Sequence, residues 1–217
     1  MTSDEMFDLY EDLLLEWNEK MNLTAITSHE EIRQKHFADS LTVLPFLSDA
    51  RSLVDVGTGA GFPGIPLAIE KCDLFITLLD SLQKRVNFLE CVKTELNLKN
   101  VTCLHARAEE AARGDLRERF DVSVSRAVAR LSALAEYCLP LTKVGGKFIS
   151  MKGADASEEI ANAGEAILKL GGEIEEVARV TIPFTDIART LIIVRKIKHT
   201  PEKFPRRGCK IAKSPIV

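Results

Sequence analysis

The segment 55–64 constrains the fold of this chain more than any other stretch. It reads Asp-Val-Gly-Thr-Gly-Ala-Gly-Phe-Pro-Gly and continues the apolar run 53–56. Glycines at alternate positions allow a tight turn and a close approach of the backbone to a ligand, and Pro63 can open the following helix. In an open α/β sheet such a turn lies at the carboxyl ends of the strands, where ligands bind. The segment therefore predicts a cofactor site directly after the first strand.

Apolar runs along the rest of the chain predict an α/β fold with a mostly parallel sheet. The runs are short and apolar throughout, as expected of strands buried on both faces, and helical stretches separate them. After a helix near 160–170, two runs have a connection too short for a crossover helix, so the last strand should enter antiparallel. We expect strands at 53–56, 74–79, 101–104, 122–124, 148–151, 174–180 and 191–194, with helices at 82–96 and 131–138.

The two ends of the chain differ from this central pattern. Apolar residues at helical spacing from Met6 to Met21 predict an amphipathic helix. Ser28 and Glu31 form a capping box, which predicts a second helix running toward Pro45. We therefore expect three parts: an N-terminal helical cap at 1–50, a Rossmann-like α/β domain at 51–197 and a basic C-terminal tail at 198–217.

Charge is distributed unevenly along the sequence. Residues 195–217 hold eight basic residues and one acid, a net charge of +7, whereas the other 194 residues carry −10. A basic segment on an acidic body suggests a polyanionic partner that approaches from one side. A solvated, partly disordered terminus explains the charge equally well.

The register of the glycines distinguishes between two cofactors. Residues 59–64 match the G-x-G-x-x-G dinucleotide pattern, but that pattern should begin where the strand ends. The strand instead ends in D-x-G-x-G-x-G, in which Asp55 precedes Gly57 and Gly59. With the antiparallel last strand, this favours S-adenosylmethionine, and Asp80 after the second strand can accept hydrogen bonds from its ribose. An NAD-dependent oxidoreductase and a turn without a ligand remain as alternatives.

The residues that follow the later strands limit which kind of atom could accept a methyl group. The fourth strand is followed by Ser125-Arg126-Ala127, not by the Asn/Asp-Pro-Pro-aromatic turn typical of amine methylation. Carbon methylation of a pyrimidine needs a cysteine nucleophile, but Cys138 lies within a predicted helix. The remaining candidate for the methyl acceptor is a ring nitrogen with a free lone pair, whose methylation needs no protein base. Arg126 should point into the ligand crevice and is the best candidate for a catalytic residue.

The sequence indicates no metal site and no membrane span. Four histidines and five cysteines lack metal-ligand spacing, and the longest apolar runs are far below the ~18 residues of a span. The acidic N-terminus does not look like a secretory signal, so we expect a cytoplasmic protein with reduced thiols, acting as a monomer. The cysteines are Cys72, Cys91, Cys103, Cys138 and Cys209.

Seven short motifs in order resemble one family, the ribosomal small-subunit methyltransferase G proteins of bacteria, also called glucose-inhibited division protein B. The resemblance spans nearly the whole chain, and its one departure is that Gly208-Cys209-Lys210 replaces the usual Gly-x-Pro of the tail. The motifs lie at 17–24, 36–40, 57–66, 79–85, 107–109, 125–127 and 205–215.

This resemblance implies transfer of a methyl group from S-adenosylmethionine to N7 of a guanosine, position 527 in the 530 loop of 16S rRNA. The expected partner is thus 16S rRNA or the small ribosomal subunit. The resemblance also implies cofactor contacts at Gly57, Phe62, Ala108, Glu109 and Arg126.

Several basic residues are expected to contact the RNA. Lys152, just past the fifth strand, and Arg126 are placed to hold the base or an adjacent phosphate. Arg206 and Arg207 in the tail should contact RNA phosphates. The motif 36–40 is interpreted as a helix face that packs on the catalytic domain. A non-catalytic RNA-binding module that uses only the tail is a further alternative, but it leaves the acidic α/β body unexplained.

Overall fold

The computed structural model describes residues 1–126 and 129–216. Ala127, from the predicted motif after the fourth strand, and Val217, the last residue of the predicted tail, lie outside the described residues.

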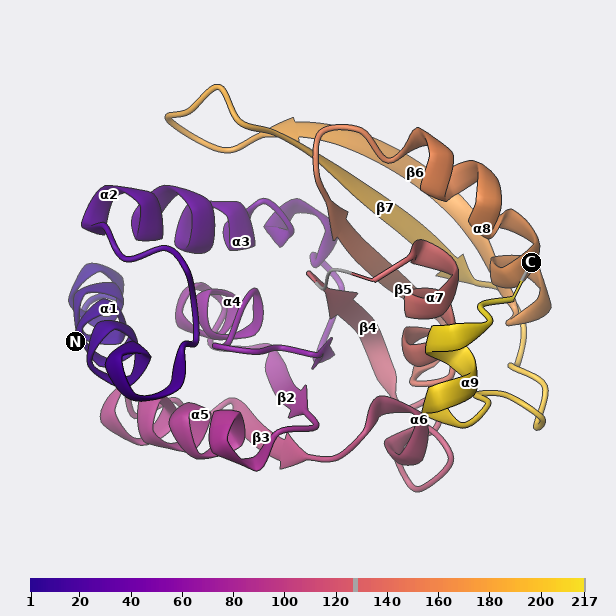
Figure 1. Ribbon diagram of the computed structural model, residues 1–217, viewed down its shortest axis with the longest axis horizontal. Helices are drawn as coiled ribbons and strands as arrows, with labels where there is room; N and C mark the ends of the chain where they lie inside the picture. The colour runs from indigo at the N-terminus through magenta and orange to yellow at the C-terminus, as the bar shows by residue number, and fades with distance from the viewer. Residues whose placement is uncertain (127–128, 217) are drawn as a thin grey trace.

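A seven-stranded sheet organises the described part of the chain (Figure 1). Its order is β3-β2-β1-β4-β5-β7-β6. The first five strands pair in parallel, and β7 runs antiparallel to both β5 and β6, which confirms the predicted antiparallel last strand. The strands are β1 Ser52–Val56, β2 Phe75–Asp80, β3 Val101–His105, β4 Phe120–Ser125, β5 Thr142–Lys152, β6 Gly172–Thr181 and β7 Ala188–Lys196.

Both faces of the central strands are buried, as their continuous apolar runs predict. Successive side chains of a strand point to opposite faces. Leu53 therefore joins one hydrophobic cluster and Val54 the other, and both are fully buried. The same alternation places Phe148 and Ile149 of β5 in different clusters.

Helices cover the two faces of the sheet separately. One cluster is formed with α1, α4 and α5, and the other with α7, α8 and the C-terminal segment (Figure 1). Pro63 caps α4, close to where the sequence predicts that helix to open. These helices are α1 Ser3–Met21, α4 Gly64–Glu70, α5 Gln83–Glu95, α7 Leu131–Cys138 and α8 Ser157–Lys169, and two short helices are α6 Ala108–Ala111 and α9 Gly208–Lys213.

The second helix of the N-terminal region begins where the capping box predicts but is not uniform. The Ser28 hydroxyl accepts a hydrogen bond from the Glu31 amide at 3.3 Å. An α-helical turn, a π-helical stretch and another α-helical turn follow one another, and a 3-10 turn precedes β1. Their bounds are α2 His29–Ile32, η1 Arg33–Ala38, α3 Asp39–Leu41 and η2 Leu44–Phe46.

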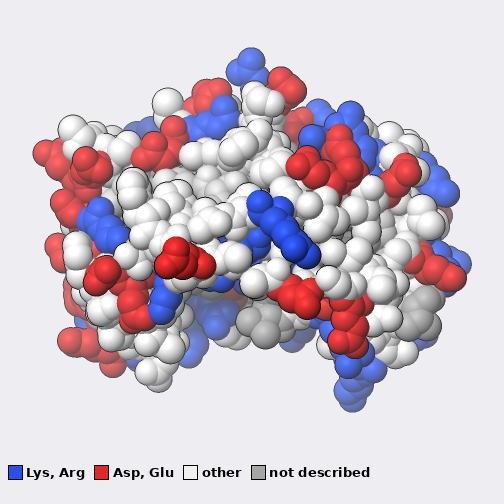
Figure 2. All heavy atoms as spheres, turned by 90° about the horizontal axis from the view of Figure 1, so that it is seen from above, with Lys and Arg blue, Asp and Glu red and all other residues white. Residues whose placement is uncertain are grey.

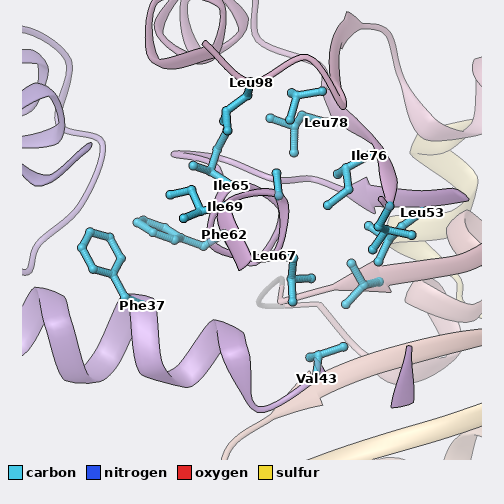
Figure 3. Packing of buried hydrophobic residues seen from close by; sticks show 14 of the residues in the cluster. Phe37, Val43, Leu53, Phe62, Ile65, Leu67, Ile69, Ile76, Leu78 and Leu98 are labelled. Atoms are coloured by element: carbon cyan, nitrogen blue, oxygen red, sulfur yellow. The ribbon is translucent and has the colours of Figure 1, made fainter. Parts of the chain in front are cut away.

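Aromatic rings attach these N-terminal helices to the body. Phe37 packs 4.9 Å from Phe7 and 5.3 Å from Tyr10, measured between ring centroids. Its ring also faces Phe62, just before α4 (Figure 3). The Tyr10 hydroxyl donates a hydrogen bond to the Ala60 carbonyl at 2.5 Å. The N-terminal helices are thus packed directly against the glycine-rich loop.

The C-terminal segment is packed against the body and includes a helix, α9, that the sequence did not predict. Phe204 and Ile216 are buried in the cluster that includes residues of α7, and Ile211 of α9 is also buried. The Arg117 guanidinium donates hydrogen bonds to the carbonyls of Thr200 at 2.6 Å and Phe204 at 2.9 Å. The terminus is therefore ordered over the described residues up to 216, which contradicts partial disorder there, while most of its basic side chains are solvated as that explanation expects.

Candidate functional site

The glycines of the loop after β1 fall into two groups with different roles. Gly57 and Gly59 have φ of +71° and +62°, and a Cβ at either position would meet nothing within 4 Å. A Cβ at Gly64 would instead lie 2.2 Å from Leu78, and one at Gly61 would lie 2.6 Å from the Tyr10 hydroxyl. The first pair leaves open space beside the backbone for a ligand. The second pair allows close packing of the loop on the core.

Asp55 fixes this loop from beneath. Its Oδ2 accepts hydrogen bonds from the Thr58 hydroxyl at 2.6 Å and the Gly64 amide at 2.8 Å. Oδ1 is buried and accepts no hydrogen bond from the described residues. Burial raises the pKa of the Asp55 carboxyl to about 6, although these two hydrogen bonds oppose the shift. Asp55 therefore holds the loop through Thr58 and Gly64, and a cofactor contact by Asp55 stays a prediction.

Asp80, at the end of β2, holds the loop from the other side. Its Oδ2 accepts a hydrogen bond from the Gly59 amide at 3.0 Å, and its Oδ1 accepts one from the Leu82 amide at 2.9 Å. The carboxylate thus stands at the carboxyl edge of the sheet beside the open face of Gly59. A ribose contact by Asp80 stays a prediction.

Arg126, directly after β4, connects the loop to the N-terminal helices. Its guanidinium carbon lies 4.9 Å from the centre of the Phe62 ring, a cation–π arrangement. It donates hydrogen bonds to Asp39 Oδ2 at 3.1 Å and to the Lys35 carbonyl at 3.0 Å. These partners hold the guanidinium in one orientation at the ligand crevice.

His36 completes this cluster as a neutral ring. It stacks on Phe62 with ring centroids 4.5 Å apart and planes at 17°. Its Nδ1 lies 3.2 Å from Arg126 Nη2, and its Nε2 lies 2.8 Å from the Thr24 hydroxyl. Burial and the adjacent Arg126 charge lower the pKa of His36 to about 4. The ring is therefore uncharged at neutral pH, and Nδ1 can accept the guanidinium N–H.

A cleft of about 990 Å³ opens beside this cluster. Residues from the N-terminal helices form one wall, and residues from the ends of β4 and β5 and from α7 and α8 form the other. The polar lining residues are Lys35, His36, Asp39, Arg126, Arg130, Ser132, Lys152, Glu158, Glu159, Asn162 and Arg189. The structure thus brings Arg126 and Lys152, both predicted to hold the substrate, to one cavity.

Ion pairs fix the charged residues of the cleft. Lys152 donates to the Ala129 carbonyl at 2.5 Å and pairs with Glu159 Oε2 at 2.8 Å. Asp39 accepts from Arg126 and also from Arg189 of β7, whose Nε lies 3.0 Å from Oδ1. The packing interpretation of the motif 36–40 is consistent with these satisfied polar groups, but it missed that His36 and Asp39 also line the cleft. The pairing with Arg189 spans 150 positions, and no local pattern marks it.

Glu109 lies at a junction with the C-terminal segment. Ala108 and Glu109 begin α6 after β3, and the Glu109 side chain is buried. A Cβ at Gly208, the first residue of α9, would lie 1.9 Å from Glu109 Oε1. The predicted cofactor residue therefore packs directly against the tail, a contact that the sequence did not indicate.

The two tail arginines are placed differently. Arg206 donates from Nε and Nη2 to the fully buried Glu136 carboxylate of α7, at 2.9 and 2.6 Å, and its backbone amide donates to the same group at 2.7 Å. Arg207, the next residue, is exposed. A phosphate contact by Arg206 would require this ion pair to open, so we retain Arg207 alone as a candidate phosphate ligand.

Among residues 1–126 and 129–216, no helix is long and apolar enough to cross a membrane. The same residues contain no group of three or more His, Cys, Asp or Glu side chains that could hold a metal ion.

Solved structures share this fold at low sequence identity. A variant of the 16S rRNA (adenine(1408)-N(1))-methyltransferase from Catenulisporales acidiphilia aligns with a TM-score of 0.58 at 14% identity, over 75% of this chain and 92% of that one. The precorrin-6y C5,15-methyltransferase from Geobacter metallireducens aligns with a TM-score of 0.55 at 18% identity, over 72% and 88%. Together with the sheet order, these similarities show a Rossmann-like methyltransferase fold.

Sequence comparison gives a closer relationship. The profile of the GidB family, described as rRNA small subunit methyltransferase G, matches residues 3–188. The ribosomal RNA small subunit methyltransferase G of Lachnoclostridium phytofermentans is 52% identical over 216 residues, 98% of this chain and 89% of that protein. The protein of the same name from Alkaliphilus metalliredigens is 52% identical over 210 residues, 95% and 88% of the two chains. This chain therefore belongs to the rRNA small subunit methyltransferase G family.

Proposed function

We propose that this protein transfers a methyl group from S-adenosylmethionine to N7 of a guanosine in 16S rRNA, at position 527 in the 530 loop. Membership in a family of rRNA methyltransferases supports the reaction class and the RNA substrate. One structural observation carries the proposal: Gly57 and Gly59 have open backbone in the loop whose Phe62 ring lies under Arg126, and Arg126 borders a preformed cleft. The NAD-dependent oxidoreductase and the non-catalytic RNA-binding module are not favoured by this membership.

The residues around the glycine loop suit S-adenosylmethionine. Gly57 and Gly59 leave space beside the backbone, and the Asp80 carboxylate can accept from ribose hydroxyls while it holds the loop. Phe62 would form an apolar wall beside the methionine part, and Glu109 would face the adenine. When bound, the cofactor supplies an electrophilic methyl carbon attached to a sulfonium.

The site performs its chemistry by positioning. Guanine N7 carries a free lone pair, so no proton has to be removed before attack. Arg126, held by Asp39 and the Lys35 carbonyl, presents a fixed cation at the crevice, and the Phe62 ring, stacked on His36, lies against its guanidinium. The neutral state of His36 agrees with a structural role for that ring.

Surface charge favours one direction of approach for the RNA. Acidic side chains gather over the end of the molecule formed by α1 and α2 (Figure 2), where the exposed acids of α1 are Asp4, Glu5, Asp8, Asp12, Glu16 and Glu19. Phosphates are repelled from that end. Basic residues of the cleft wall, Lys35, Arg126, Arg130 and Arg189, offer the opposite charge. We propose a monomeric cytoplasmic enzyme that receives the RNA at this cleft.

Transfer of radiolabelled methyl to 16S rRNA, small subunits and tRNA in parallel tests the proposal. Label is expected in 16S rRNA or the subunit, and chemical cleavage specific for 7-methylguanosine should place it at one position. Calorimetry should detect binding of S-adenosylmethionine but not of NAD. Label found in tRNA, or NAD binding without a response to S-adenosylmethionine, would contradict it.

A matched pair of glycine variants tests the proposed cofactor cradle, which is the open backbone at Gly57 and Gly59. Gly57→Val should abolish cofactor binding, because a branched side chain would enter the ligand space and would be strained at a φ of +71°. Gly164→Ala in α8 is the control, since its Cβ also meets nothing within 4 Å and the residue lies outside the cradle. Cofactor affinity should be unchanged in that control.

A further inference from the structure

We propose that Glu159 accepts hydrogen bonds from the N1–H and N2–H groups of the target guanine, and that it stabilises the positive charge which the base acquires as N7 is methylated. This inference rests on the proposed function and names the residue that selects guanine. Glu159 lies in the first turn of α8, on the cleft wall opposite the N-terminal helices.

The Glu159 carboxylate is anchored by one oxygen and open at the other. Oε2 accepts a hydrogen bond from the Leu131 amide at 2.9 Å and pairs with Lys152 Nζ at 2.8 Å. Oε1 accepts no hydrogen bond from the residues that the structure describes, and the side chain is 38% exposed at the cleft. The group is therefore held in orientation through Oε2, while Oε1, with two lone pairs, is free to accept at a residue that lines the cavity.

The charges of the cleft are arranged to orient a guanine. Arg126 and Arg189 lie where Asp39 of the N-terminal helices pairs with both of them, and Lys35 lines the same side, whereas α8 supplies Glu158 and Glu159, the latter paired with Lys152. Guanine has the same polarity, because O6 and N7 are acceptors on one edge and N1–H and N2–H are donors on the other. With its acceptor edge toward Arg126, N7 faces the cofactor cradle and the donor edge faces α8.

The same carboxylate would assist the reaction itself. As the N7 lone pair forms the bond to the methyl carbon, the carbon–sulfur bond breaks, its electron pair stays on sulfur, and the positive charge moves to the guanine ring. The N1–H then becomes a stronger donor, while its proton stays on N1. A hydrogen bond to Glu159 is thus stronger in the transition state than in the ground state, which raises the rate of transfer.

This arrangement also rejects adenine. Adenine has an acceptor at N1 and no 2-amino group, so an anionic oxygen would face a lone pair in place of two donors. An unpaired or repulsive polar contact of this kind discriminates more strongly than a missing apolar one.

A two-by-two experiment tests the inference. Wild-type protein and Glu159→Gln are each given 16S rRNA carrying guanosine or inosine at the target position, since inosine lacks only the 2-amino group. On guanosine we expect Glu159→Gln to reduce the single-turnover rate by roughly 10- to 100-fold, the range of a hydrogen bond to a charged group. Wild type should lose rate on inosine, and the variant should discriminate little between the two RNAs. Glu165→Gln, an exposed acid later in α8, is the matched control and should behave as wild type.

The readouts separate this inference from the proposed function. If wild type does not methylate the guanosine RNA, the proposed function fails. If wild type is active but the inosine substitution costs Glu159→Gln as much as it costs wild type, only the inference is overturned. A purely structural role for Glu159 would lower the melting temperature and both RNA rates together. If the variant does not fold, equal wild-type rates on guanosine and inosine would still overturn the inference.

Discussion

The N-terminal helices and the C-terminal segment both lie outside the alternating strands and helices, and they are attached to the body by different sets of contacts. The N-terminal helices are held by buried rings, with Phe37 packed between α1 and the glycine loop. The C-terminal segment buries three apolar side chains and adds charged contacts, with Arg206 on Glu136 and Arg117 on backbone carbonyls. Each also reaches the site, through His36 in one case and through the contact of Gly208 with Glu109 in the other.

This difference explains why the structure of the N-terminal region could be predicted from the sequence better than that of the C-terminal segment. Burial of apolar side chains on a helix leaves a periodic pattern, so the amphipathic helix from Met6 to Met21 is evident. An ion pair such as Arg206 with Glu136 joins residues 70 positions apart and leaves no local pattern. A positive net charge therefore describes the composition of a segment and does not tell which cations are already paired.

Loss of a buried ring should have the largest effect and should test the attachment of the N-terminal helices. Phe37→Ala is expected to lower the free energy of unfolding by about 3–5 kcal/mol, because it leaves a cavity between Phe7, Tyr10 and Phe62. Chemical denaturation would measure it. Phe184→Ala is the matched control, since that ring is fully exposed and its loss should change stability by less than about 0.5 kcal/mol. Equal effects of the two would refute the comparison.

Removal of the tail ion pair should have the next largest effect. Arg206→Ala is expected to cost about 3 kcal/mol, because the Glu136 carboxylate would remain fully buried and would keep, among the described residues, the backbone amide of residue 206 as its donor. The variant should also expose the C-terminal segment to limited proteolysis after Thr200. Arg206→Lys should rescue only partly, since an ammonium does not reproduce the planar guanidinium contact. An unchanged unfolding midpoint for Arg206→Ala would mean that the segment is held by its apolar residues.

The pH dependence of the free energy of unfolding should reveal the contribution of His36. Its folded pKa of about 4 lies below the ordinary value of 6.5, so the unfolded chain binds the proton first, and stability from this group falls as the pH drops from about 6.5 to about 4. Asp55, whose pKa is raised to about 6, acts in the opposite direction: its contribution is full below about 3.8 and is lost as the pH rises through 6. The difference between wild type and His36→Asn isolates the first effect. Parallel stability curves from pH 4 to 7 would contradict it.

The contact between the tail and Glu109 should affect ligand binding more than folding. Gly208→Ala places a methyl group where Glu109 Oε1 now lies, and that side chain can move at a cost of less than about 1 kcal/mol. If Glu109 contacts the cofactor, affinity for S-adenosylmethionine should fall several-fold by calorimetry. Unchanged affinity would place Glu109 outside the cofactor site.

Replacement of Arg207 should have the smallest effect on the protein and a specific effect on RNA. Arg207→Ala should leave stability within about 0.5 kcal/mol, because the residue is exposed. If the guanidinium neutralises one phosphate of single-stranded RNA, the slope of log K against log salt should decrease by roughly 0.7. Cofactor affinity should stay as in wild type. An unchanged salt slope would remove the last tail arginine from the RNA surface.

Much of the sheet could be predicted, because buried strands are apolar along their whole length. The largest difference is in β5, expected at 148–151, which begins at Thr142. Its first half contains Lys143, Gly145 and Lys147 and is partly exposed, so it lacks the apolar run that marks a buried strand. Pairing with β4 and the turn after α7 extend the strand where its own side chains do not.

Only part of the candidate site could be predicted from the sequence. The loop 55–64 could be predicted because its glycines are needed for a local backbone conformation. The roles of Asp39 and Glu159 could not be predicted, since their partners lie in β5, β7 and α7 or directly after β4. Contacts of that kind exist only after the fold has formed, and a single sequence holds no trace of them.

The order of the last strands has a consequence for how the protein is made. β7 lies between β5 and β6, and within residues 1–126 and 129–216 β6 pairs with β7 alone. During synthesis, residues 172–181 therefore leave the ribosome before any strand is present to receive them, and the edge of β5 stays uncovered for the same period. Open strand edges pair readily with other chains. A nascent chain that stops before residue 188 is thus exposed to aggregation at two edges, and arrival of the final strand closes both in a single step.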